Sequence, residues 1–173
     1  MILSNDKVSL RAPEPADLDF LFLLENDPDA SDNSLNTAPV SRQQMWAYID
    51  TYNADIFATS ELRLVIVDNE SGRAVGAVDL TEFSPRDRRA FVGIAIDADF
   101  RGRGLGRAAL SLLCAYAADT LGIHALAAIV AAENAASRAL FASCGFRTCG
   151  RLRSWLRHGN TYHDAQLYQR LMQ

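Results

Sequence analysis

The chain has 173 residues, of which 49% are hydrophobic and 22% charged, and its net charge is −4. These values are typical of a soluble globular protein, and we expect residues 1–173 to form a single domain. No stretch approaches the roughly 20 apolar residues of a membrane span, and the negative charge argues against a nucleic-acid-binding protein. The three cysteines are odd in number and lack Cys-x-x-Cys spacing, which disfavours a disulfide framework or a zinc site. Residues 1–6 also lack the pattern of a signal peptide, so we expect a cytoplasmic location.

Charge is distributed unevenly between the two halves of the chain. Residues 1–99 contain 8 Lys and Arg against 18 Asp and Glu, whereas residues 100–173 contain 9 Arg against 3 acids. Between residues 14 and 32 there are seven acids and no base. This asymmetry predicts that the two halves face partners of opposite charge.

The hydrophobic pattern of the first half predicts three strands and two helices. In chain order these are a strand over residues 8–11, a helix over 13–25, a loop over 26–39, a helix over 41–54 and strands over 62–67 and 74–80. Prolines and acids near residue 14 favour the start of the first helix, because proline suits a first turn and the acids complement the helix dipole. Ser41-x-x-Gln44 resembles the capping box that opens a helix.

The second half predicts alternating strands and helices that end in a hairpin. In chain order these are a strand over residues 88–97, a helix over 105–121, a strand over 125–130, a helix over 134–144 and strands over 146–157 and 162–171. Gly145 is typical of the residue that follows a helix C-terminus, and Gly159-Asn160 is typical of a hairpin turn.

A glycine-rich segment connects the strand over 88–97 to the helix that follows it. It reads Arg101-Gly102-Arg103-Gly104-Leu105-Gly106-Arg107. Glycine has no Cβ to obstruct a ligand and tolerates positive φ, so successive N–H groups can point toward one anion. The helix adds free N–H groups and the positive end of its dipole. The segment therefore predicts a binding site for a pyrophosphate.

Two other phosphate-binding patterns fit this segment less well. A P-loop requires Gly-Lys-Ser/Thr, whereas Arg107 follows the last glycine. Gly104-x-Gly106-x-x-Ala109 formally fits a dinucleotide-binding fingerprint. That fingerprint also requires an Asp or Glu at the end of the next strand to bind a ribose, and residues 125–132 contain neither. A glycine-rich surface turn without a ligand is the simplest alternative.

Two motifs together resemble the GCN5-related N-acetyltransferase (GNAT) family. Residues 101–106 resemble the Gln/Arg-x-x-Gly-x-Gly/Ala loop with which that family binds the pyrophosphate of coenzyme A. The segment from Asn134 to Phe146 resembles the family's Asn-x₆-Tyr-x-x-x-Gly-Phe motif. The resemblance covers essentially the whole chain and implies an α/β (α+β) fold. This fold is a mixed, mostly antiparallel sheet of seven strands, splayed between the fourth and fifth strands, with about four helices on its faces.

The resemblance also implies a cofactor site. Acetyl-CoA is then the co-substrate, without a metal, and the pyrophosphate lies on residues 101–107. The pantetheine arm pairs like an extra strand with Ile94-Ala95-Ile96, whose N–H groups also face the developing oxyanion. Asn134 contacts the pantetheine arm, and Phe141 packs against the acyl group.

The chain departs from the family at the proton donor. The usual tyrosine, which protonates the leaving thiolate, falls at Phe141, which has no ionisable group. The subgroup that acetylates ribosomal-protein N-termini instead has a serine in Asn-x-x-Ser, and Ser137 matches that serine. We therefore expect Ser137 to be the catalytic acid.

The chain also departs from the family at the general base. The glutamates that family members use fall at Phe91 and Leu156, so they are missing. Asp79 lies near the end of the strand over 74–80, and Glu82 follows that strand. Both are candidates for a base that acts through water. We expect Glu82 to take this role, with Asp79 as the alternative.

The acceptor is expected to be cationic. In this family the first two helices and their loop overhang the acceptor, and here that region is the acidic segment of residues 14–32. From it we expect Glu25, Asp27 and Asp32 to contact the acceptor, with Tyr162 at the mouth of the site. Short motifs such as Arg88-Arg89-Ala90 resemble spermidine acetyltransferases and ribosomal-protein acetyltransferases. A polyamine-like molecule or a basic peptide N-terminus fits this charge.

Other functions stay open at this point. The missing tyrosine and glutamates are compatible with a non-catalytic regulator that binds acyl-CoA or a polyamine. An NAD-binding fragment is a third reading, although the length leaves no room for a substrate domain. Small acetyltransferases of this type often pair through their last strands, so we expect a homodimer or a larger homo-oligomer.

Overall fold

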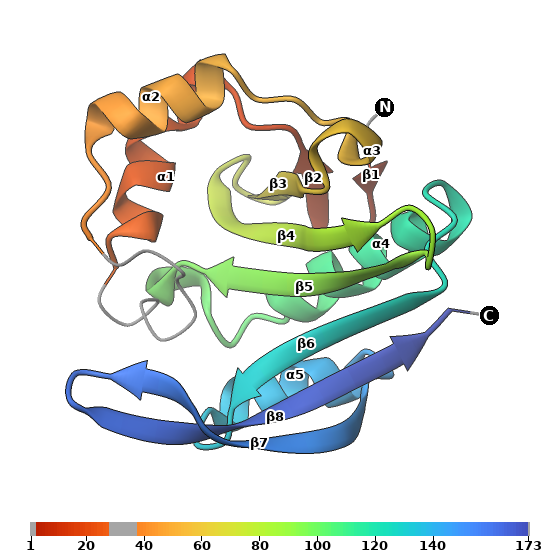
Figure 1. The fold of residues 1–173 in the computed structure, drawn as a ribbon. Coiled ribbons are helices and arrows are strands. Elements are labelled where there is room, and N and C mark those ends of the chain that lie inside the picture. The colour runs from red at the N-terminus through yellow and green to blue at the C-terminus, as the bar shows by residue number, and fades with distance from the viewer. Residues whose placement is uncertain (1–2, 28–37, 173) are drawn as a thin grey trace.

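The computed structural model describes residues 3–27 and 38–172, and it consists of one sheet with helices on both faces (Figure 1). The strands are β1 (Leu3–Ser4), β2 (Val8–Arg11), β3 (Leu62–Asp68), β4 (Ala74–Ser84), β5 (Arg89–Ile96), β6 (Ala125–Ala131), β7 (Arg147–His158) and β8 (Thr161–Leu171). The helices are α1 (Leu18–Glu25), α2 (Arg42–Asp50), α3 (Ile56–Thr59), α4 (Leu105–Asp119) and α5 (Ala135–Ser143). The strand order is β1-β2-β3-β4-β5-β6-β8-β7, and only β5 and β6 run parallel. The mixed, mostly antiparallel sheet is therefore confirmed.

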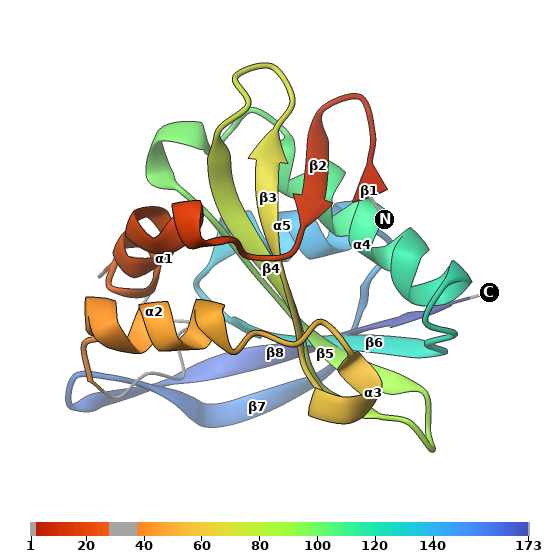
Figure 2. The ribbon, with the colours of Figure 1, turned by 90° about the horizontal axis from the view of Figure 1, so that it is seen from above.

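The two faces of the sheet carry different helices. Seen from above, α1 and α2 lie on one side and α4 and α5 on the other (Figure 2). Strand β3 shows why its sequence is a continuous apolar run: Leu64 and Ile66 enter the core beneath α4, whereas Val65 packs beneath α1 and α2. No helix within residues 3–27 and 38–172 combines the length and apolar character that crossing a bilayer requires.

The structure has one strand and one helix more than expected. The added strand, β1, has two residues, and the added helix, α3, is a single turn capped by the carboxylate of Asp55. Elements this short contain only about one period of either pattern, so periodicity does not detect them. The second helix ends at Asp50 rather than near residue 54, although Ser41 and Gln44 form the expected capping box.

The expected splay between the two parallel strands is confirmed. Strand β5 pairs with β6 only over Arg89–Phe91, opposite Ala125–Ala127. From Val92 to Ile96, β5 pairs with β4 alone, while β6 continues along β8. In Figure 1 the two strands accordingly diverge toward their carboxyl ends. Among the residues that the structure describes, the divergence leaves one backbone edge of β5 without a neighbouring strand.

Candidate active site

The glycine-rich segment forms a cradle at the start of α4. Gly102 and Gly104 have φ values of +77° and +79°, in the left-handed region, and Gly104 is the N-cap residue of α4. Residues with a side chain rarely adopt this backbone conformation, which explains why both positions are glycine. The N–H groups of Gly102, Arg103 and Gly104 have no hydrogen-bond acceptor among the described residues. The first turn of α4 adds further N–H groups, so this backbone fits a pyrophosphate.

The cradle lies where β5, α4 and α5 meet. A Cβ on Gly106 would lie 3.5 Å from Cγ1 of Ile96 and 3.5 Å from Cδ2 of Leu140, which is ordinary van der Waals contact. At Gly106 the first turn of α4 thus lies against the end of β5 and against α5. Ile94, Ala95 and Ile96 lead directly to this point along the edge that β6 leaves free.

The arginines of the cradle are partly held by the loop itself. Nε of Arg101 donates to the carbonyl of Ile96 at 2.9 Å, and its Nη2 lies 3.8 Å from Asp27. Arg103 donates to the carbonyl of Asp99 at 3.0 Å and lies over the ring of Phe100. Arg107 is exposed on the first turn of α4. The acidic segment and the cradle thus meet through Asp27, which the sequence had placed with the acceptor.

Lys7 is a cradle residue that the sequence analysis missed. It comes from the turn between β1 and β2, and its Nζ donates to the carbonyl of Arg103 at 3.3 Å. Lys7 is the only lysine of the chain, and this is the one sequence feature that could have drawn attention to it. The contact between Lys7 and Arg103 joins residues 96 positions apart, and hydrophobic periodicity does not reveal contacts between such distant segments.

The start of α5 presents the predicted acid. Asn134 caps the helix, because its Oδ1 accepts a hydrogen bond from the backbone N–H of Ser137 at 2.9 Å. The half-buried hydroxyl of Ser137 has no hydrogen-bond partner among the described residues, so it does not bond back to its own helix. Phe141 is only 3% exposed and packs against Phe146 and Tyr168. Its ring thus lies in the core, which leaves little surface for an acyl group.

Arg63 joins two carboxylates on the face that α1 and α2 cover. Its Nη1 lies 2.5 Å from Glu25 on α1, and its Nε and Nη2 donate to the two oxygens of Asp79 on β4 at 2.7 and 3.1 Å. The side chains of Arg63, Glu25 and Asp79 are 23%, 16% and 21% exposed. Burial disfavours the charged guanidinium, but the two carboxylates outweigh burial and hold the pKa of Arg63 above its usual value. We call these three residues the Arg63 cluster, and its net charge is −1.

The Arg63 cluster reaches the start of the splay. Asp79 pairs with Gly93 across β4 and β5, and a Cβ on Gly93 would lie 3.9 Å from Oδ2 of Asp79. Gly93 is exposed and lies two residues beyond Phe91, the last residue of β5 that pairs with β6. The carboxylate of Asp79 therefore lies over Gly93, near the start of the splay and on the face of the sheet that α1 and α2 cover.

Glu82 lies farther along β4, away from the splay. It sits in a bulge between Thr81 and Ser84 with a left-handed φ of +50°. Its side chain is exposed and has no hydrogen-bond or ion-pair partner among the described residues. The neighbouring part of β5 still pairs with β6, so Glu82 lies beyond the closed end of the splay.

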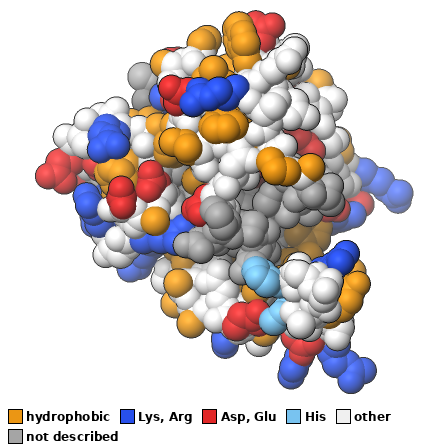
Figure 3. Space-filling model, turned by 90° about the vertical axis from the view of Figure 1, so that its left-hand side faces the viewer, with side chains coloured by type: hydrophobic (Ala, Val, Ile, Leu, Met, Phe, Trp, Pro, Cys, Tyr) orange, Lys and Arg blue, Asp and Glu red, His pale blue; other side chains and the backbone are white. Residues whose placement is uncertain are grey.

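Tyr162 and Asp32 were also predicted to contact the acceptor. Tyr162 is 62% exposed on the β7–β8 hairpin, opposite Arg157. Asp32 lies outside the described residues. Figure 3 shows the end of the molecule toward which β5 and β6 diverge, and acidic and basic side chains are interspersed on this face. Among the described residues, no three His, Cys, Asp or Glu side chains are grouped as metal ligands would be.

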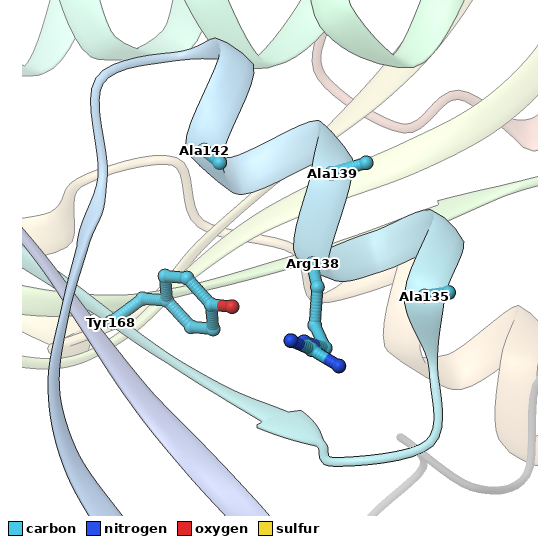
Figure 4. A pocket seen from close by; sticks show the side chains of 5 residues that line it. All are labelled: Ala135, Arg138, Ala139, Ala142 and Tyr168. Atoms are coloured by element: carbon cyan, nitrogen blue, oxygen red, sulfur yellow. The ribbon is translucent and has the colours of Figure 1, made fainter.

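A separate pocket of about 360 Å³ lies between α5 and β8 (Figure 4). Its walls are Ala135, Arg138, Ala139, Ala142 and Tyr168. None of the residues predicted for the cofactor or the acceptor lines it, so the pocket is distinct from the cradle. Arg138 donates from Nη1 to the carbonyl of Ala132 at 3.1 Å, which ties α5 to the end of β6.

Comparison with known proteins identifies the family. A family model described as an acetyltransferase (GNAT) domain matches residues 7–147. The spermidine N(1)-acetyltransferase of Vibrio cholerae is 27% identical over 162 residues, which cover 94% of this chain and 91% of the relative. The structure of spermidine N-acetyltransferase from Vibrio cholerae in complex with CoA and spermine is 27% identical and superposes with a TM-score of 0.85 over 96% of each chain.

A third comparison supports the fold alone. The ribosomal L7/L12 acetyltransferase RimL, solved in complex with coenzyme A, is 20% identical and superposes with a TM-score of 0.86 over 99% of this chain and 98% of RimL. The family model covers most of the chain, including the cradle and the start of α5. The chain therefore belongs to the GNAT family and is an N-acetyltransferase.

Proposed function

We propose that the chain transfers the acetyl group of acetyl-CoA to a primary amine of a cationic acceptor, either a polyamine-like molecule or a peptide N-terminus. The observation that carries this proposal is the backbone cradle of residues 101–107 at the mouth of the splay. The relative from Vibrio cholerae supports it, since it is a spermidine acetyltransferase whose structure is in complex with CoA and spermine. The acidic Arg63 cluster beside Gly93 supports the cationic acceptor.

The cofactor would be held by backbone groups rather than by a side-chain pocket. The N–H groups of residues 102–107 would receive the pyrophosphate, and the edge of Ile94, Ala95 and Ile96 would align the pantetheine arm. Asn134 keeps its amide donors for the arm, because its oxygen is committed to the helix cap. Bound acetyl-CoA supplies the activated acyl thioester.

The Arg63 cluster would receive the amine. An alkylammonium has a pKa of about 10, so an amine must lose a proton before it attacks. The carboxylate of Asp79 lies beside Gly93, and with Glu25 it exceeds the charge of Arg63 by one unit. One ammonium group therefore neutralises the cluster. Asp79 is the base that this position favours, and Glu82 stays the alternative.

Ser137 would protonate the leaving thiolate. Replacing Ser137 with alanine is expected to lower kcat about 10- to 30-fold while the Kd of CoA stays unchanged, because only proton delivery is lost. Ser143→Ala on the same helix is the matched control, since that hydroxyl bonds to the carbonyl of Leu140. Steady-state thiol release and calorimetric CoA binding measure both quantities. A kcat equal to that of the unaltered protein would assign the proton to water.

The acceptor class is tested by a panel of amines that differ in charge. We expect kcat/KM for spermidine or a basic peptide to exceed that for neutral amines of similar reactivity by roughly tenfold at low salt, and the difference to shrink as salt is added. Thiol release from acetyl-CoA provides the rate. Indifference to acceptor charge would contradict the cationic acceptor. Binding of CoA without thiol release for any amine would instead favour a non-catalytic regulator.

Self-association is part of the same proposal. A related spermidine N-acetyltransferase from Vibrio cholerae is described as dodecameric. In this chain β7 is one of the two edge strands of the sheet, and Trp155 on it is 57% exposed. An unpaired strand edge with an exposed aromatic residue suits pairing with a second copy. We also propose a cytoplasmic location for the protein.

A further inference from the structure

The turn between β1 and β2 is fastened to the cradle by two residues. Nζ of Lys7 donates to the carbonyl of Arg103, and Nδ2 of Asn5 donates to the carbonyl of Ala108 at 3.0 Å. Oδ1 of Asn5 also accepts from the backbone N–H groups of Lys7 and Val8, each at 3.0 Å. The shape of the turn is thus fixed, and it places the only lysine of the chain beside the N-terminus of α4.

The charge of Lys7 is not neutralised by the protein. No carboxylate lies within ion-pair distance of its Nζ in the part of the chain that the structure describes. The ammonium has three donors, and the carbonyl of Arg103 uses one of them. Nζ lies 3.3 Å from the position that a Cβ on Gly104 would occupy, so the charge borders the cradle itself.

The contact also strengthens the cradle. The carbonyl of Arg103 and the N–H of Gly104 belong to one peptide group, and a cation at the carbonyl polarises that group. The N–H of Gly104, which has no acceptor among the described residues, thereby becomes a stronger donor toward an anion. A positive charge and an oriented dipole at one point are the features of an anion site.

We propose that Lys7 is a positioning and phosphate-binding residue of the cofactor site. It holds the cradle through the carbonyl of Arg103 and directs its remaining donors to a phosphate of coenzyme A. This inference rests on the proposed function, because it requires coenzyme A to be the ligand. Lys7 lies at the phosphate end of the site, so it acts on cofactor affinity and not on the chemical step.

Calorimetric binding of CoA to three variants tests the role of the charge. Lys7→Met is expected to weaken CoA binding roughly tenfold, as loss of a hydrogen bond to a charged group does. Lys7→Arg, which keeps the charge, is expected to stay within about threefold of the unaltered protein. Arg86→Met is the matched control, because it removes an equal charge from a side chain that is 94% exposed at the far end of β5. Thermal melting of each variant verifies that it is folded.

Chemical labelling of the lysine tests the contact without relying on a variant. An amine-reactive acetylating ester modifies Lys7, the only lysine, and fragment masses distinguish it from a modified α-amino group on the same peptide. We expect saturating CoA to slow this modification several-fold and an equal concentration of pantetheine, which has no phosphate, to leave it unchanged.

The outcomes separate this inference from the proposed function. If the unaltered protein binds no CoA, both fail. If it binds CoA but Lys7→Met binds equally well, or Lys7→Arg does not restore affinity, or Arg86→Met loses as much, the role of Lys7 alone is overturned. Equal protection of Lys7 by pantetheine and CoA also overturns it, because protection would then come without a phosphate.

Discussion

Replacing Gly104 with alanine is expected to weaken binding of acetyl-CoA by a factor on the order of 30–100, whereas the same change at Gly106 stays within about threefold. Gly104 has a φ of +79°, and its new Cβ would lie 3.3 Å from Nζ of Lys7. Left-handed backbone costs an alanine roughly 1–2 kcal/mol, and relieving this strain moves N–H groups whose bonds to a charged ligand contribute roughly 1.5–3 kcal/mol each. A total loss of about 2.0–2.7 kcal/mol corresponds to the stated factor.

Gly106 is the matched control for that substitution. It lies two residues farther on, and its Cβ would be in ordinary contact with Ile96 and Leu140. Calorimetric Kd values for CoA and melting temperatures of both variants are the measurements. Unchanged binding by Gly104→Ala, or an equal loss in Gly106→Ala, would show that the backbone of the cradle does not hold the ligand.

Replacing Asp79 with asparagine is expected to lower kcat/KM for a cationic amine about 100-fold. The substitution removes the negative charge of the Arg63 cluster and the carboxylate beside Gly93, so both amine recognition and proton removal suffer. Arg63 keeps its bond to Glu25, which preserves the packing of α1 on the sheet. Glu82→Gln, which removes an exposed carboxylate from the same strand, is expected to change kcat/KM less than threefold.

The pH dependence distinguishes proton removal from recognition alone. The amine has a pKa of about 10, so kcat/KM of the unaltered enzyme is expected to rise with pH as the neutral amine accumulates. If Asp79 removes the proton, the deficit of Asp79→Asn shrinks above roughly pH 9.5, where solvent already supplies neutral amine. A deficit that is constant with pH would restrict Asp79 to binding the ammonium. A large loss in Glu82→Gln with a small one in Asp79→Asn would make Glu82 the base.

The features that the sequence predicted well have local causes. The shape of the cradle was predicted because its glycines, its arginines and the start of α4 are consecutive in the sequence. Glycine also indicates positive φ or a close approach without reference to any distant residue. The capping box of α2 and the glycine after α5 are equally local, and both are confirmed. The splay was expected from family resemblance rather than from periodicity, since an apolar strand has the same sequence pattern whether or not its edge is paired.

The features that the sequence did not reveal depend on contacts between distant segments. Lys7 reaches Arg103 across 96 positions, and Arg63 collects carboxylates from α1 and β4. Strand alternation does not reveal the bulge after Thr81, in which Glu82 adopts a left-handed conformation. Only the fold shows that Asp79, rather than Glu82, faces Gly93.

The free edge of β5 from Val92 to Ile96 affects the tendency of the protein to aggregate at the high protein concentration of a cell. An unpaired strand edge is a template for wrong pairing with other chains, and proteins usually cover or charge such edges. Here the edge lies in the middle of the sheet, and the residues of β5 that form it carry no charge to discourage wrong pairing. A ligand laid along it would close the edge, and resistance to aggregation would then depend on how much acyl carrier the cell provides.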